Sequence, residues 1–291
     1  MAMRLMIEAA LAAATALTAV LGPALQHPET RAAPALPIVV VAPGTFAFRS
    51  PGEYLKNGWP VDAPERTVTF QRGFEIMKDE VSAADYAACV ADGACKASES
   101  GTASAALPVT GVSYRDAVAY AAWLSAKTGE NWRLPTDEEW SFAAAERLHD
   151  DSLGLPQESG NPAARWLARY RAEAADDKRD TQPKPFGSFG TNSKGLADIS
   201  GNVWEWTATC YTRAVVGNDG QVAHSTENCG VRVVAGRHRG YMSTFIRDGR
   251  SGGCAAGLAP DNLGFRLVRE KLSLVGRMRL LAAEALQGWL G

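Results

Sequence analysis

The stretch best equipped for chemistry lies between Gly195 and Thr207 and reads Gly-Leu-Ala-Asp-Ile-Ser-Gly-Asn-Val-Trp-Glu-Trp-Thr. The amide oxygen of Asn202 and the carboxylate of Glu205 are three residues apart, with backbone carbonyl groups between them. Oxygen ligands of this kind suit a hard cation such as calcium. The alternative is that both side chains only bond backbone groups in a turn. The stretch therefore predicts a candidate calcium site.

A second group of reactive side chains lies in one late segment, at His238, Met242 and Cys254. Imidazole, thioether and thiolate groups together suit copper. The alternative interpretation makes Met242 a core filler and Cys254 a small buried apolar group. The same segment is rich in arginine, which suits bidentate recognition of a carboxylate or peptide ligand, although a solvated basic face is also possible. The predicted ligand groove consists of Arg237, His238, Met242, Ser243 and Arg250.

Four of the five cysteines form two local pairs. Cys89 and Cys95 are close enough in sequence to bridge a tight turn, and Cys210 and Cys229 bracket a polar loop. Two such disulfides with Cys254 left over suit an oxidising compartment. Five reduced cysteines in a cytosolic protein are the alternative.

These groups must be positioned by short elements. Residues 38–41 and 45–48 predict a β-hairpin, 65–70 a strand, and the alternation of Trp204 with Trp206 a strand with one buried aromatic face. A serine or threonine followed three residues later by Asp or Glu is typical of a helix N-terminus and predicts helices that begin after residues 82, 113 and 136. An apolar stripe predicts another helix from 161 to about 174. The acidic residues 137–139 fit helix capping better than acid–base catalysis.

Both ends of the chain differ from the rest. Residues 1–33 contain an alanine-rich apolar run after Arg4, which predicts a signal peptide or an uncleaved N-terminal anchor, with a buried helix as the alternative. Only an uncleaved anchor would place the protein at a membrane. Residues 271–291 predict an amphipathic helix that docks on its own domain, contacts a partner or lies on a membrane.

Length and composition bound the class of protein. The 291 residues, 46% hydrophobic and 21% charged, are typical of a folded globular protein with one large domain or two small ones. The net charge of -2 gives no electrostatic reason to expect a nucleic-acid partner.

Three motifs in order, Trp132 to Trp140, Gly201 to Thr207 and Asn262 to Arg266, resemble the formylglycine-generating enzyme, or sulfatase-modifying factor, family. The resemblance covers about residues 36 to 270. It implies an α+β, C-type-lectin-like fold of the formylglycine-generating enzyme type, with much irregular structure and short helices on small antiparallel sheets. It also implies that Asn202, Glu205 and backbone oxygens near Val203 hold one calcium ion.

The resemblance fails at the family's catalytic centre. In the enzymes of this family, a pair of cysteines late in the domain binds copper and oxidises a substrate cysteine to formylglycine. The matching stretch here has no cysteine between Val231 and Arg250, and a dithiolate copper site cannot form without two thiolates. Cys254 is then the remaining candidate for a catalytic thiol.

Within the family, Tyr86 to Cys95 and Gly236 to Arg239 resemble segments of accessory proteins linked to copper nitrite reductase in denitrifying bacteria. The sequence therefore predicts a periplasmic or otherwise exported maturation factor that acts on a protein or peptide partner, possible partners including a copper nitrite reductase. Two alternatives stay open: a non-catalytic lectin-like binding module for a protein or carboxylate ligand, and a copper-handling protein.

Overall fold

The computed structural model describes residues 36–101, 104–150, 152–153, 167–168, 171, 180, 182–252 and 262–270. The chain divides into two units, Met1–Pro34 and Ala35–Gly291, and every described residue belongs to the second. Among the described residues, no helix has both the length and the apolar character needed to cross a membrane. Several predictions fall outside the described residues: the N-terminal segment 1–33, most of the helix from 161, Cys254, and the C-terminal helix 271–291.

Three of the helices begin directly after a residue whose side chain caps the first helical turn. Helix α2 (Ala83–Ala91) begins after Ser82, whose hydroxyl accepts the backbone N–H of Asp85 at 2.9 Å. Helices α3 (Tyr114–Thr128) and α4 (Asp137–Ala144) each begin with a reciprocal capping box, at Ser113 and Thr136. These caps satisfy backbone N–H groups that have no partner inside the helix, so the three predicted helix starts are confirmed. The turn η1 (Ala145–Arg147) and the short α6 (Gly249–Gly252) are two further helical elements.

The described strands form three small sheets. One has the order β1-β6-β12-β7, with β1 at Ile38–Val41, β6 at Phe74–Met77, β12 at Val268–Glu270 and β7 at Asn131–Arg133. The second has the order β10-β9-β8-β3-β4, with β11 (Leu263–Gly264) parallel to β8. Its other members are β10 at Arg239–Ser243, β9 at Val222–Ala235, β8 at Trp204–Val216, β3 at Glu53–Lys56 and β4 at Trp59–Val61. The third pairs β2 (Gly44–Arg49) with β5 (Glu65–Phe70).

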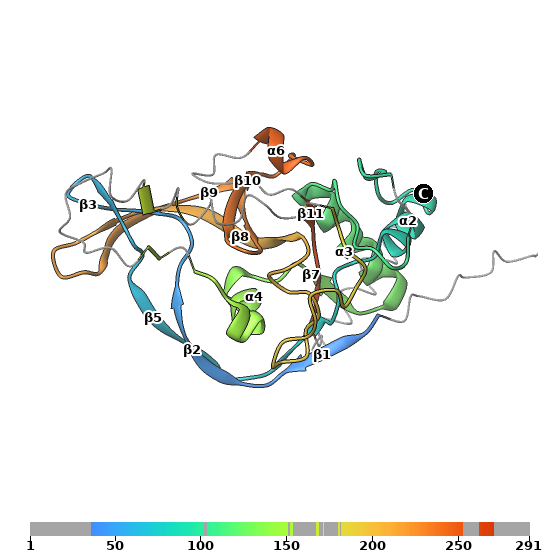
Figure 1. Cartoon of the computed structure of the whole chain (residues 1–291), viewed down its shortest axis with the longest axis horizontal. Coiled ribbons are helices and arrows are strands. Elements are labelled where there is room, and N and C mark those ends of the chain that lie inside the picture. Colours follow the sequence, from blue (N-terminus) through green and yellow to red (C-terminus); the bar gives the residue numbers. More distant parts are fainter. Residues whose placement is uncertain are drawn as a thin grey trace, which may run out of the picture. The chain divides into compact units, whose positions relative to one another are not determined.

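The predicted hairpin of residues 38–41 and 45–48 is wrong, although both strands exist. Strand β1 pairs antiparallel with β6, and β2 pairs with β5, so each finds its partner elsewhere in the chain. Pro43 and Gly44 therefore direct the chain from one sheet into another rather than turning it back. In Figure 1, β1 and β2 form one continuous curved path below α4, and α4 contacts β2, β8 and β9.

Two apolar clusters form most of the core. The larger joins α2 and α3 to β8, and its fully buried members include Trp206, Tyr120 and Phe265. The buried indole N–H of Trp206 donates to the carbonyl of Val112 at 2.8 Å, so this large side chain carries no unpaired polar atom into the core. A second cluster packs Trp140 and Phe142 of α4 against β1 and β6. The mixed α+β class is confirmed.

Both predicted disulfides are present. Cys89 and Cys95 link the end of α2 to the following turn, and Cys210 and Cys229 link β8 to β9. The second bridge closes a loop of nineteen residues, which contributes on the order of 3 kcal/mol in the chain-entropy description.

Candidate functional site

The motif from Gly201 to Thr207 places a buried ion pair at its centre, between Glu205 and Arg266. The Glu205 carboxylate accepts Arg266 Nε at 2.6 Å and Arg266 Nη2 at 2.8 Å, and it also accepts the indole N–H of Trp140 at 2.9 Å. Both charged side chains are fully buried. The sequence prediction of one buried face on β8 is therefore incomplete: the Trp204 and Trp206 face packs into the larger cluster, and the opposite face buries Glu205.

Arg266 also collects carbonyl groups from separate parts of the chain. Its Nη1 donates to the backbone oxygen of Lys78 at 2.6 Å and its Nη2 to that of Ala197 at 3.1 Å. Glutamate and carbonyl acceptors on one guanidinium satisfy the donors that burial would otherwise leave unpaired. Arg266 therefore ties β8, the end of β6 and the loop before β8 together.

A second buried carboxylate, Glu80, lies beside this pair. Its Oε1 is 3.6 Å from Arg266 Nη2, beyond hydrogen-bond distance, and neither oxygen has a hydrogen-bond partner among the described residues. Desolvation raises the pKa of Glu80 to about 8, and the neighbouring Glu205 carboxylate adds to the increase while Arg266 opposes it. The sequence analysis did not single out Glu80. Glu80 is the last of three consecutive charged residues, Lys78 to Glu80, and nothing in the sequence distinguishes it from a solvated carboxylate.

The predicted calcium ligands have other partners. The Asn202 amide oxygen accepts the backbone N–H of Lys184 at 2.9 Å, and its amide nitrogen donates to the Lys184 carbonyl at 2.9 Å. Glu205 is neutralised by Arg266, whose positive charge would repel a cation at the same carboxylate. Val203 is buried between these two residues. This arrangement does not fit calcium held by the Asn202 and Glu205 side chains, and it favours the alternative in which Asn202 bonds backbone groups.

His238 carries a buried imidazole nitrogen. Its Nδ1 lies 2.9 Å from the backbone oxygen of Arg239, and because a carbonyl oxygen only accepts, Nδ1 is the donor; in the neutral ring the lone pair then belongs to Nε2. That Nε2 atom is buried and has no hydrogen-bond partner among the described residues. The ring packs edge-on against Trp204 with centroids 5.4 Å apart, and the Trp204 indole N–H donates to the His238 carbonyl at 3.2 Å.

The other predicted groove residues do not gather around His238 as one set of ligands. Met242 is fully buried and belongs to the larger core cluster. Ser243 ends β10 and pairs with Val231, and Arg250 is an exposed residue of α6. Arg237 lies next to His238 and is half-buried. The structure thus leaves Arg237 and His238 as adjacent members of the predicted groove.

The wider arginine cluster is largely paired. Arg239 binds Asp137 with both ends of its guanidinium, at 3.2 and 2.8 Å, and both side chains are buried. Arg247 binds the α3 capping residue Asp116 at 2.7 Å. Arg232 stacks on the ring of Tyr114 at 4.5 Å. Arg232, Arg239 and Arg247 therefore each contact another part of the protein, and they do not form one shared ligand groove.

The acidic start of α4 is structural, as the sequence predicted. Glu139 closes the capping box with Thr136 and binds Arg133 through both oxygens. Asp137 is the buried partner of Arg239, and Glu138 pairs with the exposed Arg66.

One metal-type grouping occurs among the described residues, formed by Cys210, Glu227 and Cys229. The two cysteine sulfurs form a disulfide and supply no thiolate to a metal.

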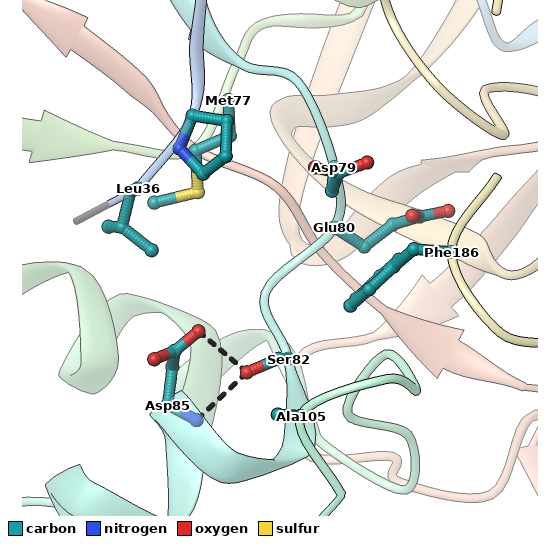
Figure 2. A pocket seen from close by; sticks show the side chains of 9 residues that line it. Leu36, Met77, Asp79, Glu80, Ser82, Asp85, Ala105 and Phe186 are labelled. Carbon is teal, nitrogen blue, oxygen red and sulfur yellow. Dashed lines mark hydrogen bonds between the residues drawn. The ribbon is translucent and has the colours of Figure 1, made fainter. Parts of the chain in front are cut away.

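A cavity of about 230 Å³ lies where α2 begins. Figure 2 shows its lining: Leu36 and Met77 lie on one side, Asp79, Glu80 and Phe186 on the other, and the Ser82–Asp85 cap of α2 below them. The residues that line it are Leu36, Pro37, Met77, Asp79, Glu80, Ser82, Asp85, Ala105 and Phe186. None of them was a predicted site residue.

Comparison with known proteins identifies the family of this chain and supports its fold. Residues 24–271 match the sulfatase-modifying factor enzyme 1-like domain, so the chain belongs to this family. The structure is also similar to that of PvdO from Pseudomonas aeruginosa, with a TM-score of 0.51 and 22% identity over 80% of this chain and 94% of that one, which supports the fold.

Two curated relatives show how far the similarity extends. The inactive C-alpha-formylglycine-generating enzyme 2 of Mus musculus is 34% identical over 163 residues, covering 55% of this chain and 48% of the relative. The formylglycine-generating enzyme of Mycobacterium tuberculosis is 40% identical over 107 residues, covering 35% and 33%. The chain therefore spans half or less of the length of these relatives.

Proposed function

We propose that this protein is an exported accessory factor that recognises a polypeptide partner and does not generate formylglycine. The observation that carries the proposal is the absence of cysteine between Val231 and Arg250, the stretch that matches the family's copper-binding cysteine pair. In the structure, this stretch forms part of β9, the His238 turn and β10, and two of its arginines, Arg239 and Arg247, pair with Asp137 and Asp116 of the same chain. The similarity to a relative that is named an inactive formylglycine-generating enzyme also supports a protein that does not generate formylglycine.

Export is supported by the two disulfides, which persist in oxidising compartments. The proposed partner is a copper nitrite reductase, on the basis of the resemblance of Tyr86 to Cys95 and Gly236 to Arg239 to nitrite-reductase-linked accessory proteins. A role in denitrification follows from that partner.

The test incubates the full chain with Cu(I), oxygen and a cysteine peptide that a formylglycine-generating enzyme converts in parallel. Mass spectrometry is expected to find the aldehyde only with the enzyme. Binding of the full chain to purified copper nitrite reductase is then measured by calorimetry, with Arg237→Ala and the distant Glu227→Gln as a pair of variants. We expect Arg237→Ala to weaken binding and Glu227→Gln to leave it unchanged. Aldehyde formation would reject the claim that the protein does not generate formylglycine. Absence of binding would reject the reductase as its partner.

A second candidate, copper handling, is favoured by one observation: the buried lone pair on His238 Nε2. Imidazole is a good copper ligand, and Nδ1–H bonded to a carbonyl is the usual orientation of a metal-binding histidine. Stoichiometric Cu(I) binding that is lost in both His238→Ala and Cys254→Ser would establish this role. Binding that survives His238→Ala would exclude the site at His238.

A further inference from the structure

The Cys210–Cys229 disulfide lies at an irregular point of a long strand pair. Strands β8 and β9 run antiparallel, and Figure 1 shows them side by side. Cys210 pairs with Arg232, whereas the next residue of β8 pairs with Asn228, so the register skips residues 229–231 and these form a bulge. Strand pairing continues on both sides of the bulge. The backbones of the two strands can therefore stay paired when the disulfide opens.

The two halves of this disulfide differ in exposure. Cys229 is exposed, whereas Cys210 is half-buried. Thiol–disulfide exchange begins when a thiolate attacks one sulfur of the bond, so access helps to decide which sulfur is attacked. A thiolate from solvent is therefore expected to attack Cys229, with Cys210 as the leaving group.

Arg232 places a positive charge beside the leaving sulfur. Its Nη1 donates to Cys210 Sγ at 3.0 Å and also to the carbonyl of Ala208, and its guanidinium stacks on the ring of Tyr114. None of these three partners carries a negative charge, so the positive charge of Arg232 remains available to a thiolate that forms on Cys210. A cation beside a cysteine favours the thiolate over the thiol, and the thiol with the more stable thiolate leaves faster.

A carboxylate near both sulfurs does not reverse this difference. One Glu227 oxygen lies within 4.8 Å of the sulfurs of Cys210 and Cys229, and the Glu227 side chain is exposed. Its negative charge opposes a thiolate on either sulfur, and solvent screens this effect. Arg232 contacts Cys210 Sγ directly, so Cys210 is the better leaving group of the two.

The second disulfide of the chain provides a comparison. Cys89 and Cys95 are 0% and 8% exposed, and both belong to the larger core cluster. A thiolate in solvent reaches such buried sulfurs only after local opening of the fold. The two disulfides of this protein should therefore differ in reactivity.

We propose that the Cys210–Cys229 disulfide is a thiol–disulfide exchange site, at which a thiolate of a substrate dithiol attacks Cys229 while Arg232 stabilises the departing thiolate of Cys210. An S–S bond forms between the substrate and Cys229 as the Cys210–Cys229 bond breaks, and the electron pair of the broken bond leaves on Cys210. The second substrate thiolate then attacks the substrate sulfur of this mixed disulfide and releases Cys229. The substrate dithiol is thereby oxidised to a disulfide and the protein disulfide is reduced to two thiols, which take up the two substrate protons through solvent. This activity goes beyond the proposed function and does not depend on a copper nitrite reductase as partner.

The first experiment identifies the attacked sulfur. The full chain is mixed with reduced glutathione, free thiols are trapped with N-ethylmaleimide, and the modified cysteines are mapped by mass spectrometry. We expect glutathione on Cys229 about tenfold more often than on Cys210, and the Cys89–Cys95 disulfide should open about tenfold more slowly or less. Glutathione mainly on Cys210, or equal opening of the two disulfides, would overturn the proposal.

A dithiol peptide then tests the complete exchange. An excess of acetyl-Cys-Gly-Gly-Cys-amide is added to the full chain without oxygen, and both reactants are followed by mass spectrometry. We expect the peptide to form an internal disulfide in the same molar amount as the Cys210–Cys229 bond is lost. A bond that stays intact, or that is lost without oxidation of the peptide, would contradict the proposed exchange.

Variants test the role of Arg232. Arg232→Met should slow the opening by glutathione about threefold or more, because the leaving sulfur loses its cation, and Arg232→Lys should restore part of the rate. Arg213→Met removes an exposed arginine of the same strand and should leave the rate unchanged. Equal rates in Arg232→Met and Arg213→Met would show that Arg232 does not assist the leaving group.

A pH profile separates this role from simple packing. In Cys229→Ser the Cys210 thiol is free, and its alkylation by iodoacetamide should rise at a lower pH than in the same variant with Arg232→Met, because Arg232 stabilises the thiolate. Identical profiles would show that Arg232 only packs against Tyr114. If Arg232→Met fails to fold, the profile with Arg232→Lys and the sulfur attacked by glutathione decide.

Discussion

At the scale of single residues, Glu80 dominates the electrostatics of this fold. It lies between Asp79 and Val81, in the middle of the segment that joins β6 to α2, and it is buried against an arginine that is already bound to another glutamate. One guanidinium cannot neutralise two carboxylates, so burial shifts the proton equilibrium of the less well bonded one. As a consequence, the contribution of Glu80 to the free energy of unfolding decreases as the pH rises, whereas a carboxylic acid with a lowered pKa has the opposite effect.

The pH dependence has a definite sign. The pKa of Glu80 is about 8 in the folded protein and near its ordinary value of 4.5 when the chain unfolds. Between these values only the folded state keeps the proton, so its stabilising contribution is complete below pH 4.5 and is lost as the pH rises to about 8. Glu80→Gln removes this group. The free energy of unfolding of the variant, relative to that of the natural protein, should therefore increase by on the order of a few kcal/mol between pH 5 and pH 9.

Urea unfolding of both proteins at pH 5, 7 and 9 measures this effect. The comparison cancels contributions from Asp79, whose pKa is also raised by desolvation. Glu227→Gln is the control and should stay parallel to the natural protein at every pH. A constant difference between Glu80→Gln and the natural protein would show that Glu80 is ionised in the folded state.

At the scale of elements, the helices are set by their first turns. In α3 the backbone N–H and the hydroxyl of Ser113 both donate to Asp116 Oδ2, at 2.9 and 2.6 Å, while Asp116 Oδ1 accepts Arg247. These bonds lower the pKa of Asp116 against the opposing effect of burial. The cap therefore joins the start of α3 to the segment after β10.

Ser113→Ala removes the hydroxyl that completes this cap. We expect a loss of about 1–2 kcal/mol in the free energy of unfolding, since the site is buried and the Asp116 carboxylate also loses a donor. The measurement is the urea midpoint at unchanged m-value. Ser98→Ala, at a polar site distant from any helix start, should shift the midpoint little. Equal shifts in the two variants would show that the cap contributes no stability.

At the scale of the whole described domain, Arg266 connects the two larger sheets. It follows β11, binds Glu205 of β8 and donates to backbone carbonyls of Met77, Lys78 and Ala197. Few other side chains could supply this many donors in a fixed plane. One guanidinium therefore links the two sheets.

Arg266→Met keeps a similar volume but leaves Glu205 and Glu80 buried without a counter-charge. We expect a loss of about 3–5 kcal/mol, as for other broken buried ion pairs. Arg213→Met breaks the exposed pair with Glu53 and should cost about 0–1 kcal/mol. Thermal and urea unfolding compare the two. A loss of similar size in both variants would show that burial of Arg266 does not matter for stability.

The sequence alone determined features that depend on near neighbours. The caps at Ser82, Ser113 and Thr136 and the two disulfides were predicted because their partners lie within a few residues or across a short loop. The family and the α+β class were predicted because three motifs occur in the right order.

Only the tertiary structure decided which distant groups meet. Strand β1 pairs with β6 instead of β2, Asn202 bonds Lys184, and Glu205 binds Arg266 rather than presenting its oxygens to a cation. Glu80, an ordinary charged residue in the sequence, becomes the least satisfied buried carboxylate. The physical reason is that strand pairing and the neutralisation of a buried charge depend on what packs against a residue from elsewhere in the chain, which spacing along the sequence does not record.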